Sequence, residues 1–380
     1  MAKKSSKKRT ASKVVSLTIF ILIAIFAIVC YFNPTLYNKI LSMLNIGDLS
    51  LLDDINRDDY PANEERYMKV HFIDIGQGDS ILIELPDSKI MLIDAGDNKN
   101  DNNTKLITYI SELGITQLDY VVATHADADH IGGMTDIFYH FEVKKVFRPY
   151  VLYDGDDYDF ENNYNKGAKE YSQDSLTYGK FLNDVLNEEY KIDGVTKECE
   201  WEFFDYTSDF GGNVIYEGET STYTVDFLTP FKLSEMDYED ANDYSPLIKV
   251  SYCDFDMLFT GDAETDAEHD FVVEYSKNAD YRAHVDVELL KVSHHGSETS
   301  STQAFLDLIK PEMAVISCGT DNSYDHPHQG VLDRLFDSNC RELYRTDKNG
   351  DIVLTIERTG EYAFDTIKDS SDNFVAPERD

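Results

Sequence analysis

The sequence contains few cysteines, and none of them stands at the spacing of a metal site or a disulfide framework. Its five cysteines are scattered through 380 residues, at positions 30, 199, 253, 318 and 340, without a CxxC pair. This spacing excludes a zinc ribbon and a dense disulfide scaffold. Two of them, Cys253 and Cys318, lie in apolar strand-like runs, where ordinary core cysteine is expected.

Positive charge is also scarce. The chain has 34 Lys and Arg residues against 72 Asp and Glu residues, which gives a net charge of −38. Six of the basic residues lie close to the start of the chain: Lys3, Lys4, Lys7, Lys8, Arg9 and Lys13. The remainder is therefore strongly acidic, which keeps it soluble and disfavours broad, sequence-independent binding to phosphate backbones.

An uncharged apolar run of 19 residues occupies positions 14–32. This length suits a transmembrane helix and exceeds the apolar core of a typical signal peptide. The run also lacks a small-x-small cleavage site, which argues against the alternative of a cleaved signal peptide. Because basic residues precede it and none follows until Lys39, the positive-inside rule places residues 1–13 in the cytoplasm. We therefore predict a single-pass anchor in the cell membrane, with the rest of the chain outside the cell.

Beyond this anchor, the pattern predicts one folded domain between two polar segments. Residues 33–66 are rich in Asp and Asn and read as a linker, residues 67–369 as the domain, and residues 370–380 as a polar tail that we expect to be loose. We interpret the Tyr- and Asp-rich stretch from about 152 to 218 as an insertion with a helix near Leu176–Leu186. No internal repeat is visible.

Short β-type runs alternate with segments of helical spacing along the domain. Strands are predicted within residues 70–75, 80–85, 89–96, 118–124, 143–150, 223–228, 246–252, 256–262, 287–296, 313–319, 341–346, 351–357 and 361–367. Further helices are predicted over residues 104–113, 131–141, 264–276, 302–309 and 328–338. Adjacent hairpins and strand–helix units in one chain favour two sheets with helices outside them.

Four groups that can bind a divalent cation follow the apolar run Val121–Ala123, in the stretch "THADADH". They are His125, Asp127, Asp129 and His130. A loop that leaves a strand is where a rigid scaffold usually presents functional groups. The alternative is a polar turn whose charges are solvated. Other motifs in the sequence are needed to distinguish a metal-binding loop from such a turn.

Three further motifs also follow predicted strands. They contain His294 and His295 in "VSHHGS", His326 and His328 in "YDHPH", and Asp262 at the end of "LFTGD". Histidine and carboxylate ligands suit Zn²⁺, Mn²⁺ or iron. Strand ends that converge on one edge of a sandwich could supply two metal sites that share a bridging carboxylate, and such a pair activates a water for hydrolysis.

These motifs resemble those of the metallo-β-lactamase superfamily, whose signature is His-x-[His/Asp]-x-Asp-His. The stretches "HFIDIGQGDSILIELP", "ATHADADHIGGM", "LLKVSHHGSETSS", "AVISCGTDNSYDHPHQGVLDRL" and "YRTDKNGDI" are also similar to the extracellular hydrolase domain of ComEC-type DNA-uptake proteins. The similarity runs from about Val70 to Glu357. The resemblance implies an αββα sandwich of the α/β (α+β) class. In this chain the sandwich follows one predicted transmembrane span, whereas the full competence protein has several channel helices.

The resemblance also implies a ligand set for two divalent ions, Zn²⁺ or Mn²⁺. His125 and Asp127 would bind the first ion, Asp129 and His130 the second, and Asp262 would bridge them. Asp127 could instead orient a neighbouring histidine. Asp129 is also expected to be essential for catalysis.

Other roles stay open at this point. We favour His294 over His295 as the remaining ligand of the second ion, with the other histidine orienting its neighbours. His326 and His328 are expected to be catalytic, as proton donors to the leaving group or as phosphate contacts; they could also be ligands or a polar helix start. Asp94, in "IDAG", would fix the loop.

One departure from the superfamily pattern concerns the first ion. A further histidine ligand usually lies between the first motif and the bridging aspartate, but only His140 is available there, in a predicted helix end. An ordinary surface histidine is expected at that position. The ComEC-like pattern has Asn242–Ser245 instead, so the first ion is expected to bind weakly or to be completed by water or substrate.

The chemistry that we predict is metal-dependent hydrolysis of a phosphodiester, with DNA as the favoured substrate. The acidic balance argues against DNA unless four basic residues gather near the site: Arg334, Arg341, Arg345 and Lys348. A smaller phosphodiester of the cell envelope, such as a phosphorylcholine-bearing polymer, is the alternative substrate. A non-catalytic accessory subunit of DNA uptake is the alternative function, and no obligate protein partner is inferred.

Overall fold

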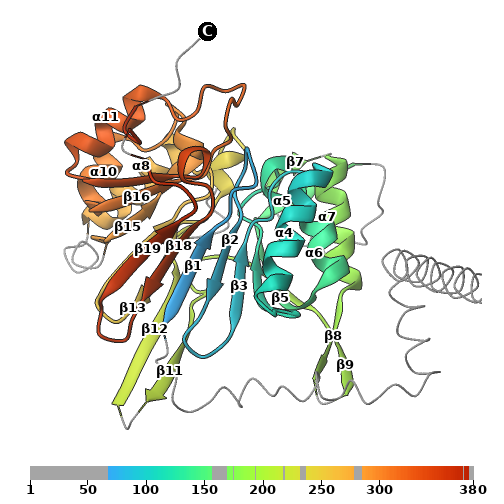
Figure 1. The fold of residues 1–380 in the computed structure, drawn as a ribbon. Coiled ribbons are helices and arrows are strands. Elements are labelled where there is room, and N and C mark those ends of the chain that lie inside the picture. The colour runs from blue at the N-terminus through green and yellow to red at the C-terminus, as the bar shows by residue number, and fades with distance from the viewer. Residues whose placement is uncertain are drawn as a thin grey trace, which may run out of the picture. The chain divides into compact units, whose positions relative to one another are not determined.

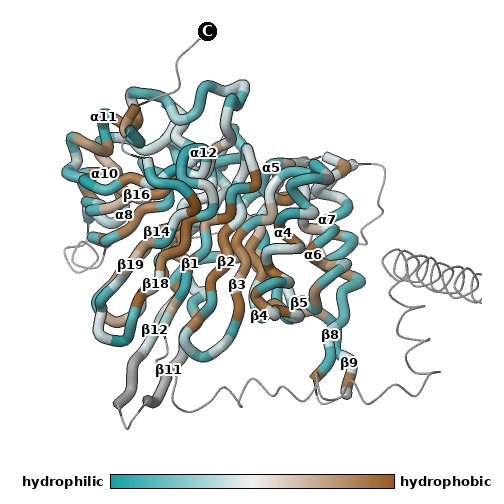
Figure 2. Tube along the Cα trace, viewed as in Figure 1, coloured by the Kyte–Doolittle hydropathy of each residue, from teal (hydrophilic) through white to brown (hydrophobic). Residues whose placement is uncertain are grey.

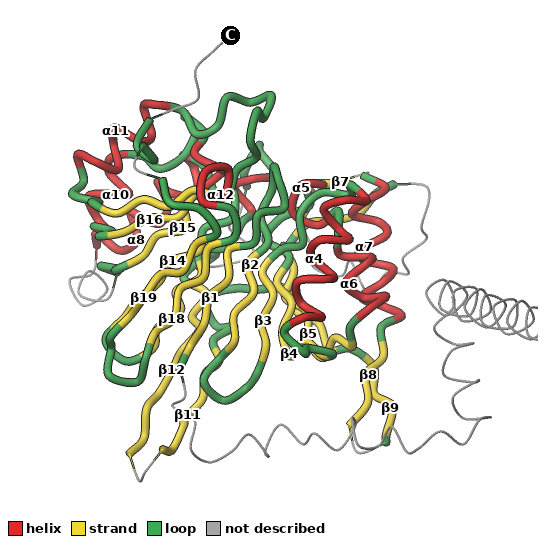
Figure 3. Tube along the Cα trace, viewed as in Figure 1, coloured by secondary structure: helices red, strands yellow, loops and turns green. Residues whose placement is uncertain are grey.

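The computed structural model describes residues 67–155, 169–173, 175–192, 194–216, 219–231, 237–277, 285–370 and 372–375. Two β-sheets face each other, and helices cover their outer faces (Figure 1, Figure 3). This is the sandwich architecture that the sequence predicts. Among the described residues, no helix is long and apolar enough to cross a membrane. The predicted span over residues 14–32 lies outside them and stays a prediction.

The first sheet has eight strands in the order β10-β5-β4-β3-β2-β1-β18-β19. Their bounds are β1 Met68–Phe72, β2 Ile81–Glu84, β3 Ile90–Ile93, β4 Gln117–Val122, β5 Glu142–Arg148, β10 Glu200–Phe203, β18 Ile352–Ile356 and β19 Tyr362–Thr366. Strand β1 pairs with β18, with Met68 opposite Ile356. The beginning and the end of the domain therefore lie side by side in one sheet.

The second sheet has seven strands in the order β11-β12-β13-β14-β15-β16-β17. Their bounds are β11 Phe210–Tyr216, β12 Glu219–Phe227, β13 Ile248–Tyr252, β14 Phe255–Phe259, β15 Leu289–Lys291, β16 Met313–Ile316 and β17 Glu342–Arg345. Strands β14 to β17 are parallel, so their carboxyl ends lie at the same edge. Two small sheets pair β6 Val151–Tyr153 with β7 Lys169–Gln173, and β8 Glu189–Ile192 with β9 Val195–Glu198.

The helices form the two outer layers. Beside the first sheet lie α4 Asn100–Glu112, α5 Ala128–Ile131, α6 Met134–His140 and α7 Leu176–Asn187. Beside the second lie α8 Thr265–Lys277, α10 Gln303–Ile309 and α11 Gln329–Asp337. Three short helices lie in loops: η3 Asn242–Tyr244, η4 Ser293–Gly296 and α12 Thr346–Asn349.

Buried apolar side chains fill three layers of the sandwich. One layer lies between the sheets, where Phe72 stacks on Phe259 with ring centroids 6.2 Å apart. The other two lie between each sheet and its helices. A strand that is covered on both faces has no solvent side, which is why β3 reads as the unbroken apolar run "IMLI". Figure 2 shows hydrophobic colour concentrated on strands such as β2 and β3.

The helix that the sequence predicts over Ile131–Phe141 corresponds to α6, which begins at Met134, and a separate short helix, α5, ends at Ile131. The break falls at Gly132 and Gly133, where other backbone segments approach closely. A Cβ atom at Gly133 would lie 2.2 Å from the carbonyl oxygen of Ala95, and one at Gly132 would lie 2.5 Å from the amide nitrogen of Asn98. Glycine is therefore required here for packing of the metal-motif loop against the loop after β3.

The predicted insertion contributes strands to both main sheets. Strand β10 extends the first sheet by pairing in parallel with β5, with Trp201 opposite Val146. Strand β11 forms the edge of the second sheet beside β12. Helix α7 lies where the sequence predicts one. Part of the stretch that we interpret as an insertion is thus integral to the sandwich.

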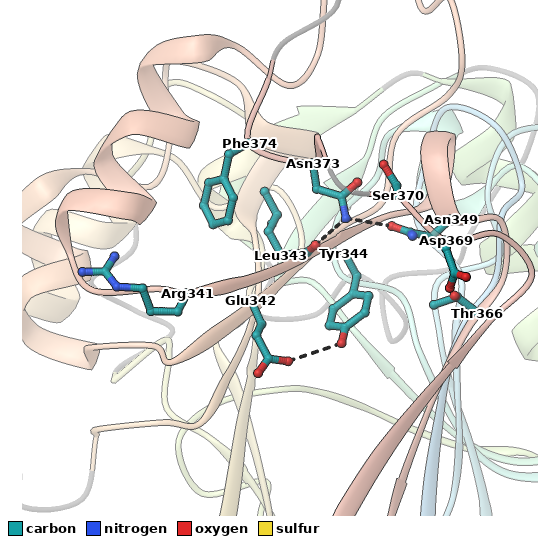
Figure 4. Close-up of a pocket in the computed structure, with 10 residues that line it drawn as sticks. All are labelled: Arg341, Glu342, Leu343, Tyr344, Asn349, Thr366, Asp369, Ser370, Asn373 and Phe374. Atoms are coloured by element: carbon teal, nitrogen blue, oxygen red, sulfur yellow. Dashed lines mark hydrogen bonds between the residues drawn. The ribbon is translucent and has the colours of Figure 1, made fainter.

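The polar tail is not loose at residues 372–375, so that expectation is wrong there. The side-chain amide of Asn373 donates to the carbonyl oxygen of Leu343 at 2.6 Å and to Asn349 Oδ1 at 3.2 Å (Figure 4). The fully buried Arg345 donates from Nη1 to the carbonyl oxygens of Asn373 and Val375, at 3.1 and 2.7 Å. A polar sequence docks here because backbone carbonyls satisfy a buried guanidinium, which composition alone does not reveal.

Candidate metal centre

The candidate site lies where loops from the two sheets meet. The first motif follows β4 of the first sheet, whereas Asp262 and the His294–His295 pair follow β14 and β15 of the second. Four residues each place a possible ligand atom within 4.8 Å of the others: Asp79, His130, Asp262 and His295. All four are buried. The structure thus brings together side chains that are far apart in the sequence.

Asp94 fixes the loop that carries the first motif. Its carboxylate accepts hydrogen bonds from the Thr124 amide at 2.9 Å, from the Thr124 hydroxyl at 2.7 Å and from His130 Nδ1 at 2.7 Å. Asp94 itself has a left-handed backbone with φ of 58°. Because Nδ1 of His130 donates to Asp94, Nε2 of the neutral ring carries the lone pair. That nitrogen lies 3.1 Å from Asp262 Oδ1.

His295, and not the favoured His294, faces this group. Nδ1 of His295 donates to the carbonyl oxygen of Ser317 at 2.9 Å. Its Nε2 lies 3.4 Å from Asp129 Oδ2 and 3.4 Å from Asp262 Oδ2. His294 and His295 both have left-handed backbones, with φ of 45° and 53°. Non-glycine residues adopt such angles rarely, and here they direct two adjacent imidazoles to different environments.

The donor set fits a divalent cation. Nε2 of His130 and Nε2 of His295 lie 3.3 Å apart, and in the neutral rings both carry lone pairs. Burial lowers the pKa of each histidine, but the nearby carboxylates, Asp262 foremost, outweigh burial and raise both pKa values well above the ordinary range. Two imidazole lone pairs and a carboxylate that converge in a buried space are stabilised by a shared cation, which takes the place of the ring protons.

The other half of the motif lies beside this group. His125 is buried, and its Nδ1 is near the hydroxyls of Thr124 at 3.1 Å and Ser245 at 3.3 Å. Its Nε2 makes no hydrogen bond within the described part of the chain. Burial, assisted by the nearby His130, lowers the pKa of His125 to about 4, which keeps the ring neutral. Burial and the Asp129 carboxylate raise the pKa of Asp127 to about 6.

The Asn242–Ser245 segment contacts the site through the hydroxyl of Ser245. Its hydroxyl contacts His125 and accepts a hydrogen bond from the amide of Asp262 at 3.2 Å. This serine therefore links the two halves of the centre through their supporting atoms. His140 is elsewhere: it is exposed at the end of α6, with Nδ1 2.8 Å from the carbonyl oxygen of Asp136.

His294 forms a hydrogen-bonded pair with Glu264. Its Nδ1 lies 2.6 Å from Glu264 Oε1, and its Nε2 lies 3.7 Å from Asp262 Oδ2. Thr299 also donates to Glu264 Oε1, at 2.6 Å. Burial lowers the pKa of His294, but Asp262 and Glu264 outweigh it, so the pKa is raised. Sequence reasoning missed Glu264, although it stands two residues after Asp262.

His326 and His328 lie next to His294. The ring centroids of His326 and His294 are 5.5 Å apart, and those of His326 and His328 are 5.0 Å apart. Burial and the neighbouring His295 and His294 lower the pKa of His326 to about 3. The amide of Glu298 donates to His328 Nδ1 at 3.1 Å. This bond leaves the proton of the neutral His328 ring on Nε2.

A buried ion pair between Asp79 and Lys291 adjoins the site. The sequence indicates only Asp79 as a candidate site residue. Asp79 Oδ2 lies 2.7 Å from Lys291 Nζ, and both side chains are at most 2% exposed. Burial alone would raise the pKa of Asp79, but Lys291 and His295 hold it below its ordinary value. The position of Asp79 after "GQG" makes it a candidate from sequence, but nothing in the apolar run "LLKV" distinguishes Lys291 from an edge-strand lysine.

Residues 73–320 match the family model of the metallo-β-lactamase superfamily. The chain belongs to this superfamily. Its resemblance to ComEC-type competence proteins is also confirmed by named relatives.

One relative is ComE operon protein 3 of Bacillus subtilis (strain 168), which is 28% identical over 320 residues, covering 80% of this chain and 35% of that protein. Another is competence protein ComA of Neisseria gonorrhoeae, 27% identical over 287 residues, covering 76% of this chain and 32% of that protein. The chain thus spans about a third of the length of these curated relatives. Among solved structures, CmlA, a diiron β-hydroxylase from Streptomyces venezuelae, aligns with 10% identity and a TM-score of 0.41, over 78% of this chain and 55% of that chain.

Proposed function

We propose that this protein is a metal-dependent phosphodiesterase of the metallo-β-lactamase superfamily. One observation carries the proposal: the facing Nε2 atoms of His130 and His295, 3.3 Å apart, converge with the Asp262 carboxylate in a buried space. Neither a folded core nor a polar surface requires this arrangement, because the lone pairs repel one another unless a proton or a cation lies between them.

The proposed ligands form two sets that share Asp262. Asp129, His130 and His295 would bind one divalent cation with it, and this set is the more complete. His125 and Asp127 would bind the other, with His125 oriented by Ser245. Zn²⁺ and Mn²⁺ both suit imidazole and carboxylate donors. When bound, the two ions would supply Lewis acidity and an activated water for attack at phosphorus.

The chain's own residues would handle the proton that the leaving group needs. His294 is the better supported donor, because Glu264 fixes its Nδ1 and leaves Nε2 on the Asp262 side. His328 holds its proton on Nε2 because its Nδ1 accepts from the Glu298 amide. His326, whose pKa is held at about 3, would remain neutral and contact substrate. We predicted the proton-donor role for His326 or His328; this assignment keeps His328, withdraws the role from His326 and adds His294.

DNA remains the first candidate substrate because the named relatives are competence proteins. One observation favours the second candidate, a smaller phosphodiester of the cell envelope. The four basic residues that would attract a polyanion contact groups within the protein. Arg345 is ion-paired with Asp347 at 2.6 Å, Lys348 with Asp372 at 3.1 Å, and the guanidiniums of Arg334 and Arg341 donate to backbone carbonyls.

The test is hydrolysis by the full-length chain, purified in detergent and loaded with Mn²⁺ or Zn²⁺. The substrates are a chromogenic phosphodiester, linear DNA, a phosphorylcholine-bearing polymer and a β-lactam. We expect hydrolysis of the chromogenic phosphodiester and of one of the two natural classes, and none in an Asp262→Asn variant. DNA binding by the metal-loaded protein without hydrolysis of any phosphodiester would instead support an accessory subunit and overturn the proposal.

A further inference from the structure

A buried lysine and a buried aspartate form an ion pair beside His295 of the proposed metal centre. Lys291 Nζ lies 2.7 Å from Asp79 Oδ2 and donates to the carbonyl oxygen of Val292 at 2.9 Å. Removing two charges from water is costly, and a buried ion pair is often no more stable than an apolar pair of the same volume. The pair's contribution to folding therefore does not account for it.

The Asp79 side chain approaches His295 on the Nδ1 side of the ring. Its Oδ1 lies 3.4 Å from Nδ1 of His295, whereas Nε2 of the same ring faces Asp129 and Asp262. The two nitrogens of an imidazole point to different sides of the ring. Asp79 thus contacts the Nδ1 side of His295, where a carboxylate supports the ring, although its ligand atoms also lie within 4.8 Å of those of His130, Asp262 and His295.

The backbone of Asp79 contacts the other ligand loop. Its amide donates to the carbonyl oxygen of Asp129 at 3.3 Å, and its own carbonyl accepts from the amide of Gly96 at 2.9 Å. The preceding Gly78 has φ of 124°, and a Cβ atom there would lie 2.2 Å from the Asp129 carbonyl oxygen. The loop that carries Asp79 can therefore press against the Asp129 loop only because residue 78 is glycine.

These contacts join elements of both sheets. Asp79 lies in the loop between β1 and β2 of the first sheet, and Lys291 is the last residue of β15 in the second. Lys291 precedes His294 by three residues. Through one ion pair, the loop that touches Asp129 is fastened to the strand that delivers His295.

We propose that the Asp79–Lys291 pair is a positioning device that holds Asp129 and His295 at the separation a shared divalent cation requires. The inference rests on the proposed function in one respect, that Asp129 and His295 are ligands. Groups that orient metal ligands typically change metal affinity by about 10- to 100-fold when they are replaced. Disruption of the pair should therefore weaken metal binding without removing any ligand.

The experiment is a double-mutant cycle on the full-length chain in detergent, with Asp79→Asn, Lys291→Met and the combined variant. Mn²⁺ and Zn²⁺ affinities are measured by competition with a chelating dye, and stability by denaturant unfolding in EDTA. We expect each single variant to lose stability because it leaves one buried charge unpaired. The combined variant should regain stability yet bind metal about 10- to 100-fold more weakly than the unmodified protein, with unchanged stoichiometry at saturation.

A matched control is Asp119→Asn. Asp119 is also buried, pairs with Lys144 at 2.6 Å and accepts from the amide of Ile90 at 2.9 Å. This variant should lose stability and keep its metal affinity. It separates general effects of a lost buried carboxylate from effects on the metal centre.

Two results would overturn the positioning role. Normal metal affinity in the combined variant would show that the pair is only a structural ion pair. Loss of one metal equivalent at saturation in Asp79→Asn would show that Asp79 is itself a ligand. Failure of the unmodified protein to bind any metal would instead overturn the proposed function. A protein that binds metal normally but hydrolyses no phosphodiester would leave the positioning role intact.

Discussion

Nε2 of His130 and Nε2 of His295 face each other at 3.3 Å although 165 residues separate them in the chain. His130 is supported by Asp94, and His295 by the carbonyl oxygen of Ser317. Each ring is thus fixed at its Nδ1 atom, and its Nε2 atom points toward the Nε2 atom of the other ring. This relationship distinguishes His295 from its neighbour His294 and leads to the first prediction.

His295→Asn should abolish tight metal binding, whereas His294→Asn should retain it. Asn tolerates the left-handed backbone at both positions, so the two variants are matched for strain. Metal content after gel filtration, measured by elemental analysis, is the readout. Retention of a full metal complement by His295→Asn together with loss in His294→Asn would reverse the assignment.

Asp129→Ala and Asp262→Ala should each abolish phosphodiester turnover and leave the fold intact. Both side chains belong to the proposed ligand sets, and their loss should exceed the roughly 100-fold effect of removing an orienting group. Circular dichroism monitors the fold. His140→Ala is the control, because His140 is exposed at the end of α6. This variant should hydrolyse the phosphodiester as fast as the unmodified protein does. A large loss in this variant would make His140 the missing ligand.

The metal-free protein should lose stability as the pH rises above about 6.5. The pKa values of His130 and His295 are raised above 6.5 by Asp262 and its neighbouring carboxylates. Histidines with raised pKa values stabilise the fold fully below their unfolded-state pKa, and this contribution disappears as the pH rises through the folded-state pKa. A bound cation replaces the ring protons, so the metal-loaded protein should not show this loss.

The measurement is the unfolding midpoint from pH 6 to pH 9, in EDTA and with saturating Mn²⁺. Metal binding should also release protons, which calorimetry in buffers of different ionisation enthalpy detects. Parallel pH profiles with and without metal would contradict this account of the two histidines.

Truncation after residue 371 should destabilise the domain by about 2 kcal/mol or more. It removes the carbonyl oxygens of Asn373 and Val375 that accept from buried Arg345, and an unsatisfied buried charged group is costly. Truncation after residue 375 keeps these bonds and should be nearly neutral. Denaturant unfolding compares the two, and equal stability would show that water replaces the lost acceptors.

The predicted topology is tested independently of the site. A charge near the middle of a transmembrane helix costs about 3 kcal/mol on insertion scales, so Ile23→Arg should reduce membrane retention. Protease treatment of intact cells, followed by detection of a C-terminal tag, reports the orientation. A tag that stays protected until the cells are lysed would place the domain in the cytoplasm and remove the argument for an extracellular substrate.

Much of the sandwich could be predicted from the sequence because its strands are buried on both faces and read as apolar runs. β3 and β16 lie within the predicted segments for this reason, and β14 begins one residue before its predicted segment. Boundaries were less predictable where tertiary contacts decide. The break between α5 and α6 depends on carbonyl groups from the loop after β3, and the docking of residues 372–375 depends on a buried arginine.

The loops that form the candidate site could be predicted from the sequence, but the directions in which their side chains point could not. The motifs identified the loops, yet the choice between His294 and His295 depends on two left-handed backbone residues, which no local pattern encodes. Lys291 escaped notice because its charge lies inside an apolar strand and is paired with a residue more than two hundred positions away. Such partners become evident only when the two sheets are assembled.

The pairing of β1 with β18 has a consequence for the order of events during synthesis. Strand β1 gains its second neighbour only after residues 352–356 have left the ribosome, because they pair with residues 68–72. At about 10 residues per second, translation of the intervening chain takes on the order of half a minute. The nascent domain would spend this time with one side of β1 unpaired, so a chaperone that shields this edge would benefit the protein more than one that acts after release.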